Sequence, residues 1–244
     1  MPTRHVSAYS YRAKLGLIVP PTNTVNEAEW AQLMPAGVTF HTHRMPLHGA
    51  GQDEALMADL SASVALLAQS GADAVAYACT AGSMTVPASR LPEAATGTTG
   101  HRVLTTSAAL IEALRALGAE RISIATPYAQ AVNDHEVEFL SAHGIETLAI
   151  AGLGIGSGGP HEFVQIARTP LEEVRKHAVE IFDPASDALL IACTDFPTLP
   201  LIPDLEATLG VPVVTSNQAT LWAMLRAVGI GDHLPGAGRL FAEH

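Results

Sequence analysis

Two segments of the chain repeat the same pattern, an apolar stretch followed directly by Ala-Cys-Thr. Residues 71–80 read Gly-Ala-Asp-Ala-Val-Ala-Tyr-Ala-Cys-Thr, and residues 185–194 read Ala-Ser-Asp-Ala-Leu-Leu-Ile-Ala-Cys-Thr. The protein has only two cysteines, Cys79 and Cys193, and they occupy the same place in both copies. Such a run predicts a buried parallel strand, whose C-terminal end reaches the sheet edge where α/β proteins bind ligands. Two such ends facing each other would place two thiols in one cleft.

Two further elements also occur twice. A short apolar strand that ends at proline is expected in residues 15–21 and again in residues 121–127. A strand leading into a helix that ends Leu-Arg-Ala-(Leu or Val)-Gly is expected in residues 103–118 and 211–229. The copies lie about 106 to 114 residues apart, which indicates an internal repeat. Strands that alternate with helices predict parallel sheets joined by right-handed crossovers.

The predicted fold class is therefore α/β, with two similar Rossmann-like (flavodoxin-like) lobes related by a pseudo-twofold axis and an active site in the cleft between them. The first lobe is predicted to contain residues 13–100 and 217–244, because the last helix should pack back onto it, and the second lobe residues 101–216. Residues 1–12 are expected to form a loose tail. Residues 152–159 hold five glycines and are expected to form a mobile loop over the site, since the dinucleotide fingerprint Gly-x-Gly-x-x-Gly is absent.

The composition argues against several classes of partner. Apolar residues make up 48 % of the 244 residues and charged residues 15 %, so a substantial core is expected. The net charge of −11 disfavours nucleic acid and anionic membranes, which need clustered Lys and Arg. No apolar run approaches the roughly 18 to 20 residues of a membrane span, and residues 1–11 lack the apolar segment of a secretory signal. The expected location is the cytoplasm.

The two cysteines have three interpretations. In a reducing cytoplasm a structural disulfide is disfavoured, and either cysteine could be a small buried hydrophobe. The equivalent placement of Cys79 and Cys193 before Thr favours a shared chemical role. Neither Cys-x-x-Cys nor His-Glu-x-x-His occurs, so no metal or cofactor is predicted. We expect His41, His43 and His48 to be solvated or hydrogen-bonded rather than metal ligands.

Two thiols at a sheet edge support two kinds of chemistry. The loops at residues 21–23 and 127–128 match each other and are expected to converge with the two Cys-Thr loops. One thiol can remove a proton while the other supplies one on the opposite face, which racemises a carbon. Alternatively, one thiol adds to an activated double bond while the other handles protons. Both routes need N–H and hydroxyl donors for an enediolate. Helix N-termini are expected to bind anions here and to lower a thiol pKa from about 8.5.

Several segments carry a resemblance to a known family. They are Gly16 to Pro20 with Asn23-Thr24 and Glu27, Ala78-Cys79-Thr80, Ala125 to Tyr128, Ala192-Cys193-Thr194, Gly210 to Ser216 and Gly236 to Leu240. From Leu15 to Leu240 the chain resembles the aspartate/glutamate racemase superfamily, and within it the branch of maleate cis-trans isomerases and arylmalonate decarboxylases. Decarboxylases of this branch have Gly at the first cysteine position, so Cys79 favours the isomerase. The second substrate-gripping Asn of maleate isomerases has no match here, where the sequence reads His161-Glu162-Phe163.

The resemblance implies a cofactor-independent reaction. Cys79 is expected to attack an alkene carbon of maleate and form a thioether enediolate, which rotates about its new single bond and eliminates to fumarate, while Cys193 manages the proton. Substrate contacts are implied for Pro20, Asn23, Thr80, Ala81, Tyr128, Thr194 and Asp195. The expected partner is a small carboxylate. A homodimer or larger homo-oligomer is expected from Trp30, Trp222 and the apolar surplus.

Three alternatives remain open. A racemase of aspartate/glutamate or hydantoin type would use the same two thiols, and the segment from Cys193 to Pro197 is similar to the second racemase motif. A decarboxylase of arylmalonate type is disfavoured by Cys79. A non-catalytic small-molecule-binding protein would also have two lobes and a cleft, but it leaves the paired Cys-Thr loops unexplained. Arg44 could meet a carboxylate or lie at the surface, Asn23 could simply shape its turn, and Tyr128 could be a core aromatic.

Overall fold

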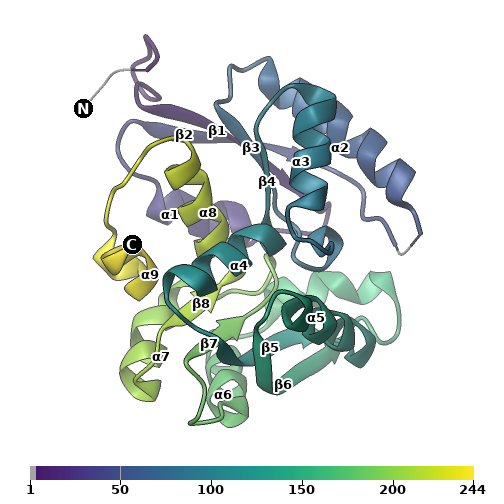
Figure 1. Ribbon diagram of the computed structural model, residues 1–244, viewed down its shortest axis with the longest axis vertical. Helices are drawn as coiled ribbons and strands as arrows, with labels where there is room; N and C mark the ends of the chain where they lie inside the picture. The colour runs from purple at the N-terminus through teal and green to yellow at the C-terminus, as the bar shows by residue number, and fades with distance from the viewer. Residues whose placement is uncertain (1–3, 50) are drawn as a thin grey trace.

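The protein consists of two α/β lobes, each built on a parallel sheet. The computed structural model describes residues 4–49 and 51–244 (Figure 1). The four-stranded sheets have the orders β2-β1-β3-β4 and β6-β5-β7-β8, and all neighbouring strands are parallel. The strands are β1 Ala13–Val19, β2 Val38–Arg44, β3 Ala74–Tyr77, β4 Val103–Thr105, β5 Arg121–Tyr128, β6 Glu146–Ile155, β7 Ala188–Ile191 and β8 Val213–Thr215. The predicted α/β class with two parallel sheets is confirmed.

The strands that precede the cysteines hold the same position in both sheets. β3 lies between β1 and β4, and β7 lies between β5 and β8. Every residue of β3 and β7 is buried, as expected for continuous apolar runs inside a parallel sheet. The register also repeats, because Leu15 pairs with Ala74 in the first sheet and Ile122 pairs with Ala188 in the second. The internal repeat therefore describes the architecture as well as the sequence.

Helices cover the sheets and fill the space between the lobes. They are α1 Asn26–Leu33, α2 Asp53–Ala68, α3 Arg90–Thr99, α4 Thr106–Ala116, α5 Gln130–Ala142, α6 Leu171–Ile181, α7 Ile202–Leu209, α8 Ser216–Ala227 and α9 Arg239–Glu243, with 3-10 turns at Ala81–Ser83, Pro160–Arg168, Leu199–Leu201 and Pro235–Ala237. Figure 1 shows α4 and α8 between the two sheets, where they pack against each other. α8 also contacts β3 and β4 of the first sheet and β8 of the second, so the last long helix lies between the two lobes. Thr105 and Thr215 cap the two helices by accepting backbone N–H groups.

Two predicted boundaries differ from the structure. The sequence predicts that residues 101–216 form the second lobe, but β4 pairs with β3 and closes the first sheet. Its counterpart β8 closes the second sheet in the same way, beside β7. The glycine-rich segment 152–159 is also not wholly a loop, because β6 continues to Ile155. Gly152 allows β6 to lie close to β5, since a Cβ at this position would lie 2.1 Å from the carbonyl oxygen of Tyr128.

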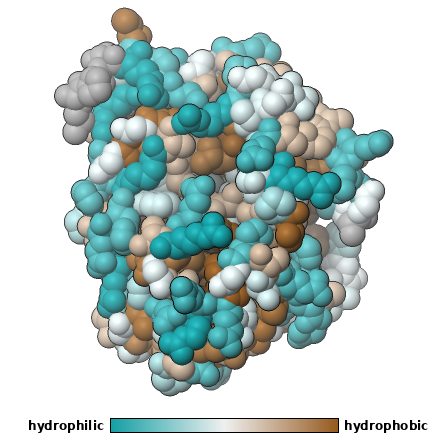
Figure 2. Space-filling view, in the orientation of Figure 1, coloured by the Kyte–Doolittle hydropathy of each residue, from teal (hydrophilic) through white to brown (hydrophobic). Residues whose placement is uncertain are grey.

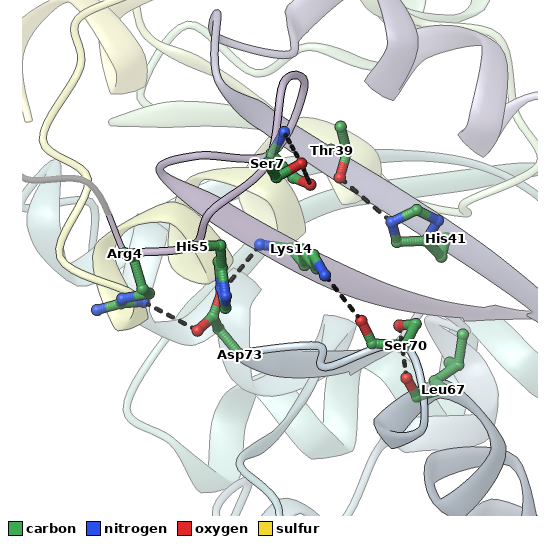
Figure 3. A network of polar contacts seen from close by, with 10 residues as sticks. Arg4, His5, Ser7, Lys14, Thr39, His41, Leu67, Ser70 and Asp73 are labelled. Carbon is green, nitrogen blue, oxygen red and sulfur yellow. Dashed lines mark hydrogen bonds and ion pairs between the residues drawn. The ribbon is translucent and has the colours of Figure 1, made fainter.

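The N-terminal segment from residue 4 onward is held against the first lobe (Figure 3). Asp73 accepts the backbone N–H of Lys14, with 2.8 Å between N and Oδ2, and His5 Nε2 lies 2.8 Å from the same oxygen. Arg4 pairs with the other carboxylate oxygen at 3.5 Å. The prediction of a loose tail is therefore wrong for residues 4–12, because a partly buried carboxylate binds this segment. The first three residues of the predicted tail lie outside the described residues.

One hydrophobic core runs through both lobes. Leu15 and Leu17 of β1 belong to the same contiguous buried cluster as Leu190 of β7. Trp30 and Trp222 are buried within the single chain, so they give no indication of an interface between chains. On the face shown in Figure 2, hydrophilic residues cover most of the surface and hydrophobic residues show in small separate areas. Within the described ranges, no helix is both long and apolar enough to cross a membrane.

Candidate active site

Both cysteines line one cavity of about 180 Å³ between the lobes. The nine residues that the sequence predicts to react with or bind substrate all line it: Pro20, Asn23, Cys79, Thr80, Ala81, Tyr128, Cys193, Thr194 and Asp195. The remaining lining residues are Thr22, Leu47, Ala129, Val132, Ile155, Gly156, Phe163 and Ile166. The segments that follow β1, β3, β5 and β7 supply most of the polar groups, because the carboxyl ends of parallel strands meet at one edge. The two thiols therefore face a common space.

Cys79 lies directly after β3 in a tightly packed turn. A hydrogen bond from the backbone N–H of Gly82 and one from the Tyr77 hydroxyl reach its thiol. A Cβ at position 82 would lie 2.9 Å from the Cys79 Sγ and 2.7 Å from the Tyr77 hydroxyl oxygen, so only glycine allows this approach. Burial raises the pKa of Cys79, although both hydrogen bonds oppose the effect. The thiol is consequently fixed in place and protonated at neutral pH.

Cys193 has an unusual backbone conformation at the end of its strand. Its φ of 107° lies in the left-handed region, which costs of order 1 to 3 kcal/mol for a residue with a side chain. Its N–H donates to Ser216 Oγ at 3.0 Å, and its Sγ accepts the N–H of Asp195 at 3.4 Å. Burial raises the pKa of Cys193 to about 12, and a hydrogen bond from Tyr128 opposes this. The expectation that helix N-termini lower the thiol pKa values is wrong, because burial outweighs them.

The two threonines beside the cysteines contribute to contacts between the lobes. Thr194 Oγ1 accepts from Asn23 Nδ2 at 3.1 Å and donates to the carbonyl oxygen of Ala78 at 3.1 Å. The single hydroxyl proton of Thr194 is thus bonded to Ala78 and is not free to bind a ligand. Thr80 Oγ1 lies 2.9 Å from Ser216 Oγ. Asn23 Nδ2 keeps a second N–H, which can bind an anion in the cavity. The phenol of Tyr128 can bind it as well when its single proton turns from the Cys193 thiol to the anion.

Asp195 joins its own loop to the start of α1. Its Oδ1 accepts the N–H groups of Thr24 at 2.7 Å and Val25 at 3.2 Å. Within the described residues its Oδ2 is buried without a hydrogen-bond partner. Burial raises the pKa of Asp195 to about 6, while those two N–H groups and the nearby Arg44 oppose the shift. The carboxylate accordingly positions the loop that carries Asn23.

Arg44 reinforces the same loop from the end of β2. It donates to the carbonyl oxygen of Asn23 at 2.7 Å and to that of Pro20 at 3.3 Å, and it pairs with Glu27. Two roles were considered for Arg44, a contact with a carboxylate and a position at the surface. The structure shows a contact with the partly exposed carboxylate of Glu27, together with hydrogen bonds to the loop.

An apolar wall forms the side of the cavity that sequence reasoning did not anticipate. It consists of Leu47, Val132, Ile155, Phe163 and Ile166. Three of these side chains come from the end of β6 and the following 3-10 turn, the region in which the sequence offered only glycines and a loop. In the sequence, the only indication of this apolar wall was the expectation that residues 152–159 lie over the site. The cavity thus has a hydrogen-bonding side and an apolar side.

The repeated sheets and the pair of thiols in a shared cavity define a two-lobed α/β protein with a two-cysteine site. The family model for arylmalonate decarboxylase matches residues 15–241, and the chain belongs to this family. The family is a branch of the aspartate/glutamate racemase-like superfamily, so the resemblance seen in the sequence is confirmed.

Relatives of two activities match almost the whole chain. The maleate isomerase of Nocardia farcinica (strain IFM 10152) is 29 % identical over 245 residues, which cover 94 % of this chain and 96 % of that protein. The arylmalonate decarboxylase of Bordetella bronchiseptica is 32 % identical over 235 residues, with the same coverage of 94 % and 96 %.

Solved structures agree with these matches. A Nocardia farcinica maleate cis-trans isomerase, a cysteine-to-serine mutant with a covalently bound succinylcysteine intermediate, superposes with a TM-score of 0.84 at 27 % identity and covers 95 % of this chain and 99 % of that one. An arylmalonate decarboxylase structure gives 0.81 at 31 % identity, covering 95 % and 100 %.

Proposed function

We propose that the protein is a cofactor-independent isomerase that converts a cis-unsaturated dicarboxylate of the maleate type into its trans isomer. The observation that carries the proposal is that one thiol from each lobe, Cys79 and Cys193, lines the same cavity. The resemblance of the chain to maleate isomerases, including one with a succinylcysteine intermediate, supports the same reaction. A cysteine at position 79 is the feature that favours isomerisation over decarboxylation.

The reaction begins with the addition of Cys79 to the double bond. The thiol gives its proton to a carboxylate oxygen of the substrate as an S–C bond forms and the π bond breaks, and the electron pair moves onto the adjacent carbon and its carboxylate as an enediolate. Cys193, protonated at neutral pH, gives its proton to that carbon and takes it back before elimination. Rotation about the new single bond occurs in between. The S–C bond then breaks, the trans double bond forms and Cys79 regains its proton.

Hydrogen-bond donors stabilise the enediolate. Asn23 and Tyr128 are the side chains that we expect to face its carboxylate oxygens, together with the backbone N–H groups of the two Cys-Thr loops. Ala81 is expected to contribute only its backbone. Pro20 and Asp195 are expected to shape the site, the latter through the N–H groups of Thr24 and Val25.

The apolar wall bears on which dicarboxylate is used. Phe163 stands in the region where maleate isomerases are expected to offer a second amide, and with Ile166 it presents only carbon to the substrate. An alkyl group on the double bond would be desolvated there, with a gain of roughly 0.8 kcal/mol for each buried methylene. We therefore expect 2-methylmaleate to be used at least as well as maleate.

Proton NMR in D2O tests the proposal with maleate, 2-methylmaleate, aspartate and phenylmalonate as separate substrates. The expected result is conversion of the first two to their trans isomers without added metal or cofactor. Deuterium entering aspartate at its α-carbon would instead identify a racemase, and loss of carbon dioxide from phenylmalonate a decarboxylase. Binding of these acids without any turnover would identify a binding protein.

We also propose that the chain forms a cytoplasmic homo-oligomer. Exposed apolar side chains such as Leu66, Val164 and Leu171 support an assembly. Light scattering on the purified protein tests it, and a mass of 25.5 kDa would contradict it.

A further inference from the structure

Ser216 touches both cysteine loops through a single hydroxyl. It is the first residue of α8 and is fully buried. Its Oγ accepts the backbone N–H of Cys193 at 3.0 Å and lies 2.9 Å from the hydroxyl oxygen of Thr80, which directly follows Cys79. An N–H in one loop and a hydroxyl in the other are therefore bonded to the same oxygen atom.

The hydroxyl of Ser216 thus forms a bridge between the two cysteine loops, and the helix start that carries it is rigid. Thr215 and Gln218 form a capping box at the start of α8, so the backbone beside Ser216 is fixed. The carbonyl oxygen of Ser216 accepts the hydroxyl of Thr220 at 2.7 Å. α8 itself packs between the two sheets and contacts strands of both lobes. A hydroxyl held in this way can set the position of the loops that bind to it.

Cys193 needs such a support because of its backbone conformation. A φ of 107° is disfavoured for any residue with a Cβ, and such residues persist only where their surroundings hold them. The N–H of Cys193 donates to Ser216, and loss of that acceptor would leave a buried donor unpaired. The peptide would then be free to relax toward negative φ, which would turn the thiol away from its present direction.

We infer that Ser216 is a positioning residue that couples the two thiol loops and keeps Cys193 aimed at the cavity. It acts through Cys193 and Thr80 and does not line the cavity itself. As a role in catalysis, the inference rests on the proposed function. As a statement about thiol geometry, it can be tested without any substrate.

The test compares Ser216→Ala with a matched control, Ser123→Ala. Ser123 is also fully buried, accepts a backbone N–H (that of Asp183, at 2.8 Å) and pairs with a hydroxyl (that of Ser186, at 2.8 Å), but neither partner belongs to a cysteine loop. Both variants thus lose the same kinds of hydrogen bond. Ser216→Thr serves as the rescue, because the equivalent position in α4 is the buried Thr106.

Three readouts are taken on each variant. They are amide hydrogen exchange at Cys193, the rate of iodoacetamide labelling of each cysteine by peptide mapping, and kcat and KM with maleate. In Ser216→Ala we expect Cys193 amide exchange to accelerate about fivefold or more through the lost hydrogen bond. Its labelling rate should change by a similar factor, and kcat should fall about ten- to a hundredfold through misplacement of the thiol. Ser123→Ala and Ser216→Thr should stay within about threefold of wild type, which at under 1 kcal/mol is smaller than the loss of one hydrogen bond.

Thr80→Val, which removes the other end of the bridge, keeps the test decisive if Ser216→Ala does not fold. Because the hydroxyls are coupled, exchange at Cys193 should accelerate in this variant as well. Exchange and labelling of Cys193 within twofold of wild type, in whichever of the two variants folds, would overturn the inference. An altered Cys193 together with no turnover of any dicarboxylate by the wild type would contradict the proposed function and leave the geometric statement standing.

Discussion

Asn23 of the first lobe donates a hydrogen bond to Thr194 of the second, with Nδ2 3.1 Å from Oγ1. Thr194 in turn donates to the carbonyl oxygen of Ala78, the residue before Cys79. The Oδ1 of Asn23 accepts the N–H groups of Val25 and Asn26 at the start of α1. One amide therefore joins a helix terminus to the loops that carry both thiols.

Replacement of Asn23 by Ala should lower stability and activity together. The change removes an acceptor for two buried N–H groups and a donor to Thr194, which should cost about 1 to 3 kcal/mol in the free energy of unfolding. We also expect kcat/KM with maleate to fall about tenfold or more, since one donor to the enediolate is lost. Urea denaturation and steady-state kinetics measure the two effects. Gln32→Ala, an exposed change on α1, should alter neither.

Glu29 should contribute strongly to the stability of the contact between the lobes. It is buried on α1 and accepts the backbone N–H groups of Thr198 at 2.6 Å and Leu199 at 2.7 Å, and the amide of Asn217 at 2.7 Å. Glu29→Ala leaves these donors unpaired, so the free energy of unfolding should drop by roughly 2 to 5 kcal/mol. The control is Glu27→Ala on the same helix. Glu27 pairs with Arg44 near the surface, where a salt bridge contributes only about 0 to 1 kcal/mol. Equal losses in urea denaturation would contradict this account.

Glu136 should make stability depend on pH. It is fully buried on α5, and burial raises its pKa from 4.5 to about 8. A carboxyl with a raised pKa favours the folded state in its neutral form. Its contribution is complete below pH 4.5 and is lost as the pH rises through about 8. The difference in melting temperature, Glu136→Gln minus wild type, should therefore increase as the pH rises from 5 to 9. Parallel curves for the two proteins would contradict the prediction, and Glu138→Gln, an exposed change on α5, should follow wild type.

Asp195 should affect the acidity of Cys193. Burial is the main reason why the pKa of Cys193 is raised to about 12, and the Asp195 carboxylate adds to it. Asp195→Asn keeps an oxygen for the N–H groups of Thr24 and Val25 but removes the charge. We expect the pH midpoint of Cys193 labelling by iodoacetamide to move down, although burial should keep it above the ordinary value of about 8.5. A midpoint that stays in place or moves up would refute the assignment.

The repeat in the sequence predicted the parts of the fold that depend on buried strands. The repeat extends to Asp73 and Asp187. Each precedes its cysteine strand and accepts a backbone N–H near the start of a neighbouring strand at 2.8 Å, from Lys14 and Arg121 respectively. Continuous apolar runs such as β3 and β7 are typical of strands buried on both faces of a parallel sheet. The convergence of Cys79 with the second lobe followed from that arrangement.

Other features depend on tertiary contacts that no local pattern encodes. β4 has three residues, too few to indicate which sheet it joins, so the lobe boundary was misplaced. The raised pKa of Cys193 follows from burial, which a helix start in the sequence does not reveal. The apolar side of the cavity comes from residues after a glycine-rich segment that looked like a loop. Ser216 appeared only as part of a motif, and its bond to Cys193 is visible only in the folded chain.

The most direct test of the account follows a covalent bond rather than a rate. Cys193→Ser is incubated with maleate, its intact mass is measured and its peptides are mapped, with Cys79→Ser treated in parallel. The account predicts a succinyl adduct on Cys79 in the first variant, none in the second, and loss of turnover in both. Wild-type turnover by either variant, or an adduct on any residue outside the cavity, would contradict the claim that the two thiols act on one bound acid.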